Sequence, residues 1–374
     1  MNVEVWQEMA PAGLWLVWSA VALAFLHMLA LPRKGKKTVL WAGLGGAVGL
    51  GLFVVGSDVV FKSLGWVQNS QIVRERFYRP GDIGKAPVYL FVGSSYTRAG
   101  INPALANEIL KENGLQARIM IRSAGGASRL EQWRFVKETQ ALLGDQLQGV
   151  FFEVSHSIDH LPVYGLKSPM SGRALSQFDV QGTKWVLDAL VLADETTQLR
   201  GIEEKGEAGR QVLSHLLVSS LNIGLAHHLL DKNDLRNRSS YVPREVAEKD
   251  YDPYLQARLL KERAWEQDPS RLPKIRPNPW VRGYFDDVER LLKNSGVELS
   301  GFYVPPYGTH TQRRYGFQFC QYQSDVLCVN ANKRDLIDRL GPQMWIDSSH
   351  LRREGSETFT RWLIERLISQ GGLS

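Results

Sequence analysis

The sequence contains few of the residues from which metal centres are built, because it has only two cysteines and eight histidines among 374 residues. Neither Cys320 nor Cys328 has His or Cys neighbours at the spacing of a structural zinc site. His215, His227 and His228 fall in a pattern of helical spacing, which favours surface or packing roles over metal binding. We therefore expect neither a metal nor a cofactor.

A dense stripe of Lys and Arg interleaved with aromatic residues is also lacking. The formal charge of +6 resolves into +4 from a short loop at residues 33–37, −2 from Glu4 and Glu8, and +4 spread over residues 38–374. Such a dilute charge does not match the electrostatic footprint of a nucleic-acid-binding protein. We therefore expect no DNA or RNA partner.

Charged residues are absent from two segments near the N-terminus, residues 12–31 and 38–57. Each segment is long enough to span about 30 Å as a helix, which is the thickness of the hydrocarbon core of a bilayer. The sequence thus predicts a domain boundary near residue 57, with two transmembrane helices before it. Residues 58–86 follow as a juxtamembrane connector.

The charge around these two segments predicts their orientation. Arg33, Lys34, Lys36 and Lys37 lie between them, and a short loop with this positive charge is normally retained in the cytoplasm. The first segment lacks the basic leader of a cleavable signal peptide. We therefore expect a two-pass anchor in a bacterial-type inner (cytoplasmic) membrane, with the rest of the chain on the periplasmic or extracellular side.

The expected position outside the cytoplasm affects the oxidation state of the two cysteines. Outside the cytoplasm, Cys320 and Cys328 can close the short segment between them as a disulfide, and the alternative is a pair of buried thiols. The expected orientation favours the disulfide.

From residue 87 onward, strand and helix patterns alternate. Short apolar strands are predicted at 88–92, 118–121, 149–154 and 297–304, and helices at 103–113, 129–143 and through Phe359 to Leu367. This alternation predicts an α/β fold, a three-layer α/β/α flavodoxin-like parallel sheet spanning 87–374. Residues 160–290 break the rhythm with helical patterns, and we interpret them as a helical insertion.

A serine pair follows the first predicted strand directly. Gly93, Ser94 and Ser95 stand between that strand and a helix, which puts a hydroxyl at the carboxyl edge of the sheet, where ligands bind in open α/β folds. Either serine is a candidate nucleophile. The alternative is a turn or helix cap, which an isolated Gly-Ser-Ser more often represents.

The complementary groups lie near the C-terminus. Asp347 and His350 are three residues apart just before a helix. A carboxylate that accepts from one imidazole nitrogen leaves the other nitrogen to take a proton from a serine. The alternative is a capping Asp beside a surface His.

Taken together, these segments resemble the SGNH, or GDSL-type, hydrolase superfamily. The resemblance spans residues 88–370 in order and assigns Ser95 as nucleophile, with Asp347 and His350 as the other members of a catalytic triad. It also implies oxyanion-hole donors at Ser95 and at Gly125 or Gly126. The chain looks most similar to the membrane-anchored branch of the family, which includes proteins of teichoic acid D-alanylation and alginate O-acetylation.

One position departs from the family pattern, because the Asn expected after the third strand is absent from residues 153–157. Ser155 or His156 is the candidate replacement. The loss of one oxyanion donor costs about 3 kcal/mol of transition-state stabilisation. Side chains placed to touch a substrate are Tyr96, Arg98, His156 and His310.

The resemblance implies a membrane-anchored serine acyl-transfer enzyme. The expected activity is that of an O-acetyltransferase or O-acyl esterase acting on an exported polysaccharide or another polymer of the cell envelope. The expected partners are the membrane, the polymer, and a membrane-bound O-acyltransferase or glycan synthase subunit. The alternative is a non-catalytic glycan-binding or assembly protein of a polysaccharide synthesis complex.

Overall fold

The computed structural model describes residues 85–155, 180–192, 279–308, 319–320, 326–348 and 350–373. The strands are β1 (Val88–Gly93), β2 (Arg118–Ser123), β3 (Leu147–Glu153), β4 (Glu298–Val304) and β5 (Cys328–Asn330). The principal helices are α5 (Ser95–Gly100), α6 (Pro103–Glu112), α7 (Arg129–Leu143), α9 (Val180–Leu192), α14 (Pro279–Asn294), α16 (Arg334–Ile337) and α17 (Arg353–Ser369). Two 3-10 turns, η1 (Gly144–Gln146) and η5 (Pro342–Met344), complete the described elements.

The strands form a five-stranded sheet in the order β2-β1-β3-β4-β5, and every pairing is parallel. This order is that of flavodoxin-like folds, in which the chain reverses its direction across the sheet between β1 and β3. The predicted α/β class and the parallel sheet are therefore confirmed.

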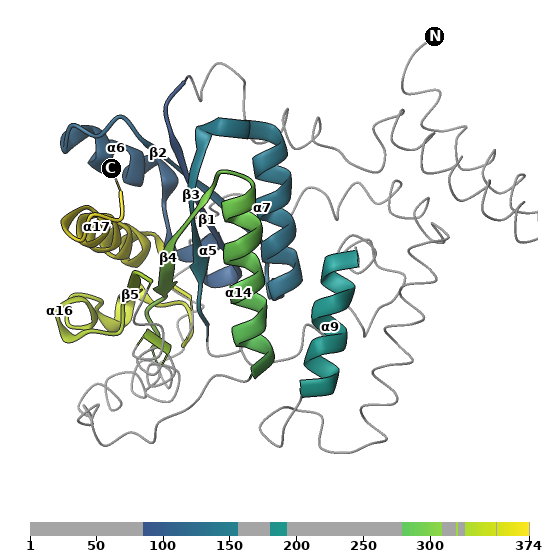
Figure 1. Ribbon diagram of the computed structural model, residues 1–374. Coiled ribbons are helices and arrows are strands. Elements are labelled where there is room, and N and C mark those ends of the chain that lie inside the picture. Colours follow the sequence, from purple (N-terminus) through teal and green to yellow (C-terminus); the bar gives the residue numbers. More distant parts are fainter. Residues whose placement is uncertain are drawn as a thin grey trace, which may run out of the picture.

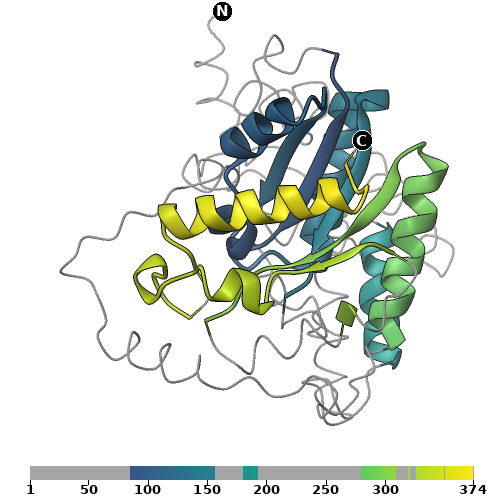
Figure 2. The ribbon, with the colours of Figure 1, turned by 90° about the vertical axis from the view of Figure 1, so that its left-hand side faces the viewer.

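Helices cover both faces of the sheet, as Figures 1 and 2 show. Helices α6 and α17 lie on one face, and α7 and α14 lie on the other, with α9 packed against α14. A separate hydrophobic cluster fills the space on each side. Because both faces are covered, β1 is buried along its whole length, which explains its continuous apolar sequence.

Local sequence signals explain where two of the helices begin. Asn102 caps α6 by accepting hydrogen bonds from the N–H groups of Ala104 and Leu105, and Pro103 occupies the first turn. Ser128 and Glu131 form a capping box at the start of α7. Both helices match the predicted ranges within a residue.

Helix α14 corrects the predicted extent of the insertion. Residues 160–290 were expected to form a helical subregion apart from the sheet, yet Trp280, Tyr284 and Phe285 on α14 are buried, and α14 packs on β4. This helix is the connection that leads into β4, so it belongs to the α/β sandwich. Strand β5 was not predicted, because it has only three residues.

Asp287 on α14 holds α9 in place. It accepts hydrogen bonds from Lys184 Nζ and Trp185 Nε1, both at 3.0 Å, and from Arg290 at 2.7 Å. Burial alone would raise the pKa of Asp287, but the hydrogen bonds from Arg290, Lys184 and Trp185 outweigh it and lower the pKa to about 2. The hydrogen bonds of Lys184 to Asp188 and then to Asp287 raise the pKa of Lys184.

The described residues contain no helix that is both long and apolar enough to cross a bilayer. The two segments predicted to do so, residues 12–31 and 38–57, lie outside the described residues, as does nearly all of the connector.

Candidate active site

Ser95 lies in the tight turn that joins β1 to α5. It is the first residue of α5, and Ser94 before it is the N-cap. Because β1 lies between β2 and β3, this turn stands at the point where the strand order reverses. Ligands of flavodoxin-like folds bind at this edge of the sheet.

Asp347 and His350 lie in a reversal of the chain between η5 and α17. Trp345 and Leu351 pair across it as an antiparallel bridge, and the Ile346 N–H donates to the His350 carbonyl at 2.9 Å. Within the reversal, the His350 N–H donates to Asp347 Oδ1 at 2.8 Å. These backbone hydrogen bonds alone hold the Asp347 carboxylate beside the His350 imidazole.

The three side chains form a continuous chain of contacts. His350 Nδ1 lies 2.8 Å from Asp347 Oδ2 and 2.9 Å from Oδ1, and His350 Nε2 lies 2.8 Å from Ser95 Oγ. A carboxylate can only accept, so Nδ1 carries the proton and Nε2 is left to accept from the serine. This is the geometry of a Ser-His-Asp triad, made from residues 255 positions apart in the chain.

Ser94 has a different role. Its hydroxyl donates to Glu153 Oε1 at 2.6 Å and accepts from the Tyr96 N–H at 3.3 Å, and its side chain is buried. The hydroxyl therefore points into the fold, and Ser95 is the serine of the pair that contacts His350.

The predicted oxyanion donors lie in the loops on either side of Ser95. Gly125 and Gly126 follow β2, whose last residue pairs with Gly93, and both are exposed. Gly126 has a φ of 62°, a left-handed conformation that favours glycine. Ser155 follows β3 on the other side and is buried.

Tyr96 was expected to touch substrate, and the structure places it against His350. Its ring stacks on that of His350 with centroids 5.5 Å apart, and it meets Tyr307 edge-on at 5.4 Å. Tyr96 thus limits the rotation of the imidazole. Arg98 lies in the last turn of α5 and is half-buried.

His156 and His310 lie outside the described residues, and so do His215, His227 and His228. Within the described ranges, no group of three or more His, Cys, Asp or Glu is arranged to hold a metal ion.

Asn332 supports the site and was not predicted. Its side chain accepts from the Tyr307 N–H at 2.9 Å and donates to the Pro305 carbonyl at 3.0 Å, which fixes the chain after β4. The Gly308 N–H then donates to the Ser348 carbonyl at 2.9 Å, inside the loop that carries Asp347. The signal available was the pair Asn330 and Asn332, which follows a short apolar run at residues 326–329.

Cys320 and Cys328 form a disulfide with Cα atoms 5.4 Å apart. The bond ties residues 319–320 to the first residue of β5, and Phe319 packs edge-on against Phe285 and Phe302 in the core.

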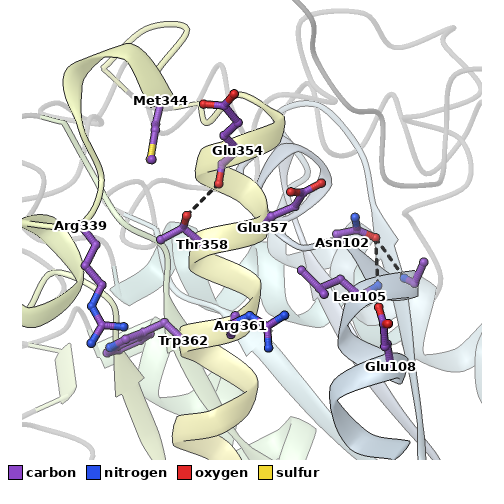
Figure 3. Close-up of a pocket in the computed structure, with 11 residues that line it drawn as sticks. Asn102, Leu105, Glu108, Arg339, Met344, Glu354, Glu357, Thr358, Arg361 and Trp362 are labelled. Carbon is purple, nitrogen blue, oxygen red and sulfur yellow. Dashed lines mark hydrogen bonds between the residues drawn. The ribbon is translucent and has the colours of Figure 1, made fainter. Parts of the chain in front are cut away.

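A cavity of about 730 Å³ lies along α17, away from the triad (Figure 3). Its lining comes from α6, from α17 and from the chain near η5, and it includes neither Ser95 nor His350. Both acidic and basic side chains line it, as Figure 3 shows for Glu354, Glu357 and Arg361.

Comparison of the sequence with protein-family models and with curated proteins finds no match.

Proposed function

We propose that the protein is a serine acyl-transfer enzyme. The observation that carries the proposal is the 2.8 Å contact between Ser95 Oγ and His350 Nε2, in a ring whose other nitrogen faces Asp347. A serine hydroxyl is a weak nucleophile, and a positioned general base oriented by a third group is what activates it.

In the first half of the reaction, Ser95 Oγ attacks the carbonyl carbon of an ester as its proton passes to His350 Nε2. The Asp347 carboxylate stabilises the imidazolium that forms. The oxyanion of the tetrahedral intermediate accepts from the Ser95 N–H and from a glycine N–H after β2, Gly125 or Gly126. His350 then returns the proton to the leaving alcohol, and an acyl-serine remains.

In the second half, a hydroxyl compound takes the place of the leaving alcohol. His350 removes its proton, the acyl group passes to its oxygen, and Ser95 recovers its hydrogen from His350. A sugar hydroxyl as acceptor makes the protein an O-acyltransferase, whereas water makes it an esterase. We favour O-acetylation of an exported polysaccharide or another envelope polymer.

The resemblance to the membrane-anchored branch of the SGNH superfamily supports this substrate class. The order Ser95, Asp347, His350 along the chain agrees with the family, as does a nucleophile directly after β1. The proposed site of action is the outer side of the cytoplasmic membrane, with segments 12–31 and 38–57 as the anchor. The disulfide between Cys320 and Cys328 supports an oxidising compartment.

A fluorophosphonate probe, which reacts with activated serines, tests the proposal on the full chain. Wild type should be labelled, Ser95→Ala should not, and His350→Gln should react at least about 100-fold more slowly because general-base catalysis is lost. Thr358→Ala, which removes an exposed hydroxyl on α17, is a matched control and should label as wild type does.

Fresh wild type that has not been treated with the probe would next be given an aryl acetate with and without an oligosaccharide acceptor. Acetyl transfer to sugar in excess of hydrolysis indicates a transferase. If wild type neither reacts with the probe nor cleaves the acetate, the catalytic proposal is wrong and the alternative of a non-catalytic glycan-binding or assembly protein replaces it.

The orientation is tested separately. A reporter fused after Ser374 that is active only outside the cytoplasm should be active in cells, and activity of a cytoplasm-specific reporter at the same position would overturn the proposed topology.

A further inference from the structure

A buried carboxylate lies directly beneath the turn that carries Ser95. Glu153 is the last residue of β3, at the reversal point of the sheet beside β1, and it is 0% exposed. A charged group is rarely buried this completely unless hydrogen bonds or an opposite charge compensate it. We therefore expect hydrogen-bond donors or a cation around the Glu153 carboxyl group.

Among the described residues, the four hydrogen bonds to the Glu153 side chain come from the two residues that flank the Ser95–Tyr96 pair. Oε1 accepts from the Ser94 hydroxyl at 2.6 Å, and Oε2 accepts from the Ser94 N–H at 2.9 Å. Oε2 also accepts from the N–H of Thr97 at 3.0 Å and from its hydroxyl at 2.5 Å. Two of these donors are backbone N–H groups, which can only donate, so the carboxyl group of Glu153 holds the backbone of the turn at both Ser94 and Thr97.

Neighbouring groups are arranged around this carboxylate. The single hydroxyl hydrogen of Thr97 goes to Glu153, so the Tyr303 hydroxyl, 2.5 Å away, must be the donor to Thr97 Oγ1. Burial raises the pKa of Tyr303, and the charge of Glu153 raises it further, which keeps Tyr303 protonated as this role requires.

A buried cation contacts the backbone of the same residue. Arg129 is itself only 6% exposed, and its Nη1 donates to the main-chain oxygen of Glu153 at 2.6 Å and to Gln132 Oε1 at 2.7 Å. A buried charge near a buried countercharge is much less costly than an isolated one.

The same contacts give a physical reason for Gly93. A Cβ atom at this position would overlap Thr97 Oγ1 and lie 2.5 Å from Glu153 Oε2. Glycine therefore stands before the serine pair because the carboxylate of Glu153 comes that close to the backbone.

We propose that Glu153 is a positioning residue that sets the orientation of Ser95 toward His350. Its side-chain hydrogen bonds are with Ser94 and Thr97 rather than with Ser95 or His350, so it acts by holding the residues on both sides of the nucleophile. This inference rests on the proposed function. Its consequence is that loss of the carboxylate slows attack by Ser95 while leaving the binding of the ester largely unchanged.

The test compares Glu153→Gln with wild type as full chains, by fluorophosphonate labelling and by steady-state cleavage of an aryl acetate. The introduced NH2 group would face Ser94 or Thr97 donors, so the turn must shift. A displacement of the nucleophile by about 1 Å costs about 100-fold in rate, so we expect kcat to fall by that order with KM within about twofold. Glu153→Asp keeps the charge and should recover part of the loss.

A second variant separates positioning from general destabilisation. Val288→Ala removes two methyl groups from a fully buried position on α14 and should lower the melting temperature without changing kcat at temperatures well below unfolding. Thr97→Val removes one partner of the same carboxylate. Its effect on kcat should be less than additive with Glu153→Gln, because both changes release the same turn.

The outcomes are distinguishable from those of the proposed function. If wild type labels at Ser95 but Glu153→Gln retains its kcat, or loses activity only in proportion to its fraction unfolded as Val288→Ala does, the positioning role is wrong and the triad assignment stands. If wild type does not label at all, the proposed function fails first.

Discussion

Replacing Asp347 with its amide is the sharpest test of the triad geometry. In Asp347→Asn the amide oxygen must stay at the Oδ1 position, because the His350 N–H donates to it at 2.8 Å. The NH2 group then takes the Oδ2 position, 2.8 Å from His350 Nδ1. Two donors cannot face each other, so the imidazole shifts its proton to Nε2 and can no longer accept from Ser95.

The magnitude follows from how exposed the carboxylate is. A wrong tautomer in a buried triad costs about 10⁴-fold in rate. The Asp347 side chain is 46% exposed, and Oδ1 at 2.9 Å from Nδ1 can still accept in a minor arrangement. We therefore expect a loss of about 10³-fold, which corresponds to about 4 kcal/mol of transition-state stabilisation.

The assay is the rate of fluorophosphonate labelling of Ser95 at neutral pH, with thermal unfolding measured in parallel. Asp338→Asn is the matched control, because Asp338 is an exposed carboxylate paired with Arg334 on the surface and should label at the wild-type rate. A loss of less than about tenfold for Asp347→Asn would refute the argument from the tautomer.

Three further predictions concern stability and covalent structure. Gly93→Ala should lower the free energy of unfolding by at least about 2 kcal/mol because of overpacking. Gly283→Ala is the control, because an added Cβ there meets no atom within 4 Å. Equal urea midpoints for the two variants would contradict this prediction. Because the pKa of Asp287 is lowered, its ionised form contributes at most about 2 kcal/mol to the free energy of unfolding, present above pH 4 and lost as the pH falls toward 2. Asp287→Asn should therefore destabilise the protein at pH 7, and the difference from wild type should shrink below pH 4. A difference independent of pH would exclude this cause. Alkylation of the denatured chain should modify no thiol before reduction and both Cys320 and Cys328 after it, and any modification before reduction would contradict the bridge.

Much of the fold could be predicted because its signals are local. The continuous apolar run of β1 is typical of a strand covered on both faces, and the caps of α6 and α7 mark where those helices begin. Helix α14 carries a clear apolar face through Trp280, Tyr284 and Val288, but its position after a long interruption of the strand-helix rhythm assigned it to the insertion. Strand β5 has too few residues to produce a periodic pattern.

The candidate triad could be predicted because its members lie at strand and helix ends that the motif spacing marks. The contact of Glu153 with the turn that carries Ser95 could not be predicted. Glu153 looked in sequence like one polar residue at the end of an apolar strand, and nothing near it indicated whether it faced solvent or the interior. Asn332 was missed for the same reason, since its contacts are with the chain after β4.

The sequence by itself determined the class of the fold, the edge of the sheet where chemistry is expected, and the residue types available there, because apolar periodicity, caps and turns act over a few neighbouring residues. The motif resemblance favoured Ser95 over Ser94, but only the tertiary structure shows which of the two hydroxyls contacts His350. The pairing of β1 with β3 brings Glu153 under Ser94 and so turns that hydroxyl inward, while the docking of α17 brings His350 to Ser95. Both contacts join residues far apart in the chain, and no local pattern encodes such a distance.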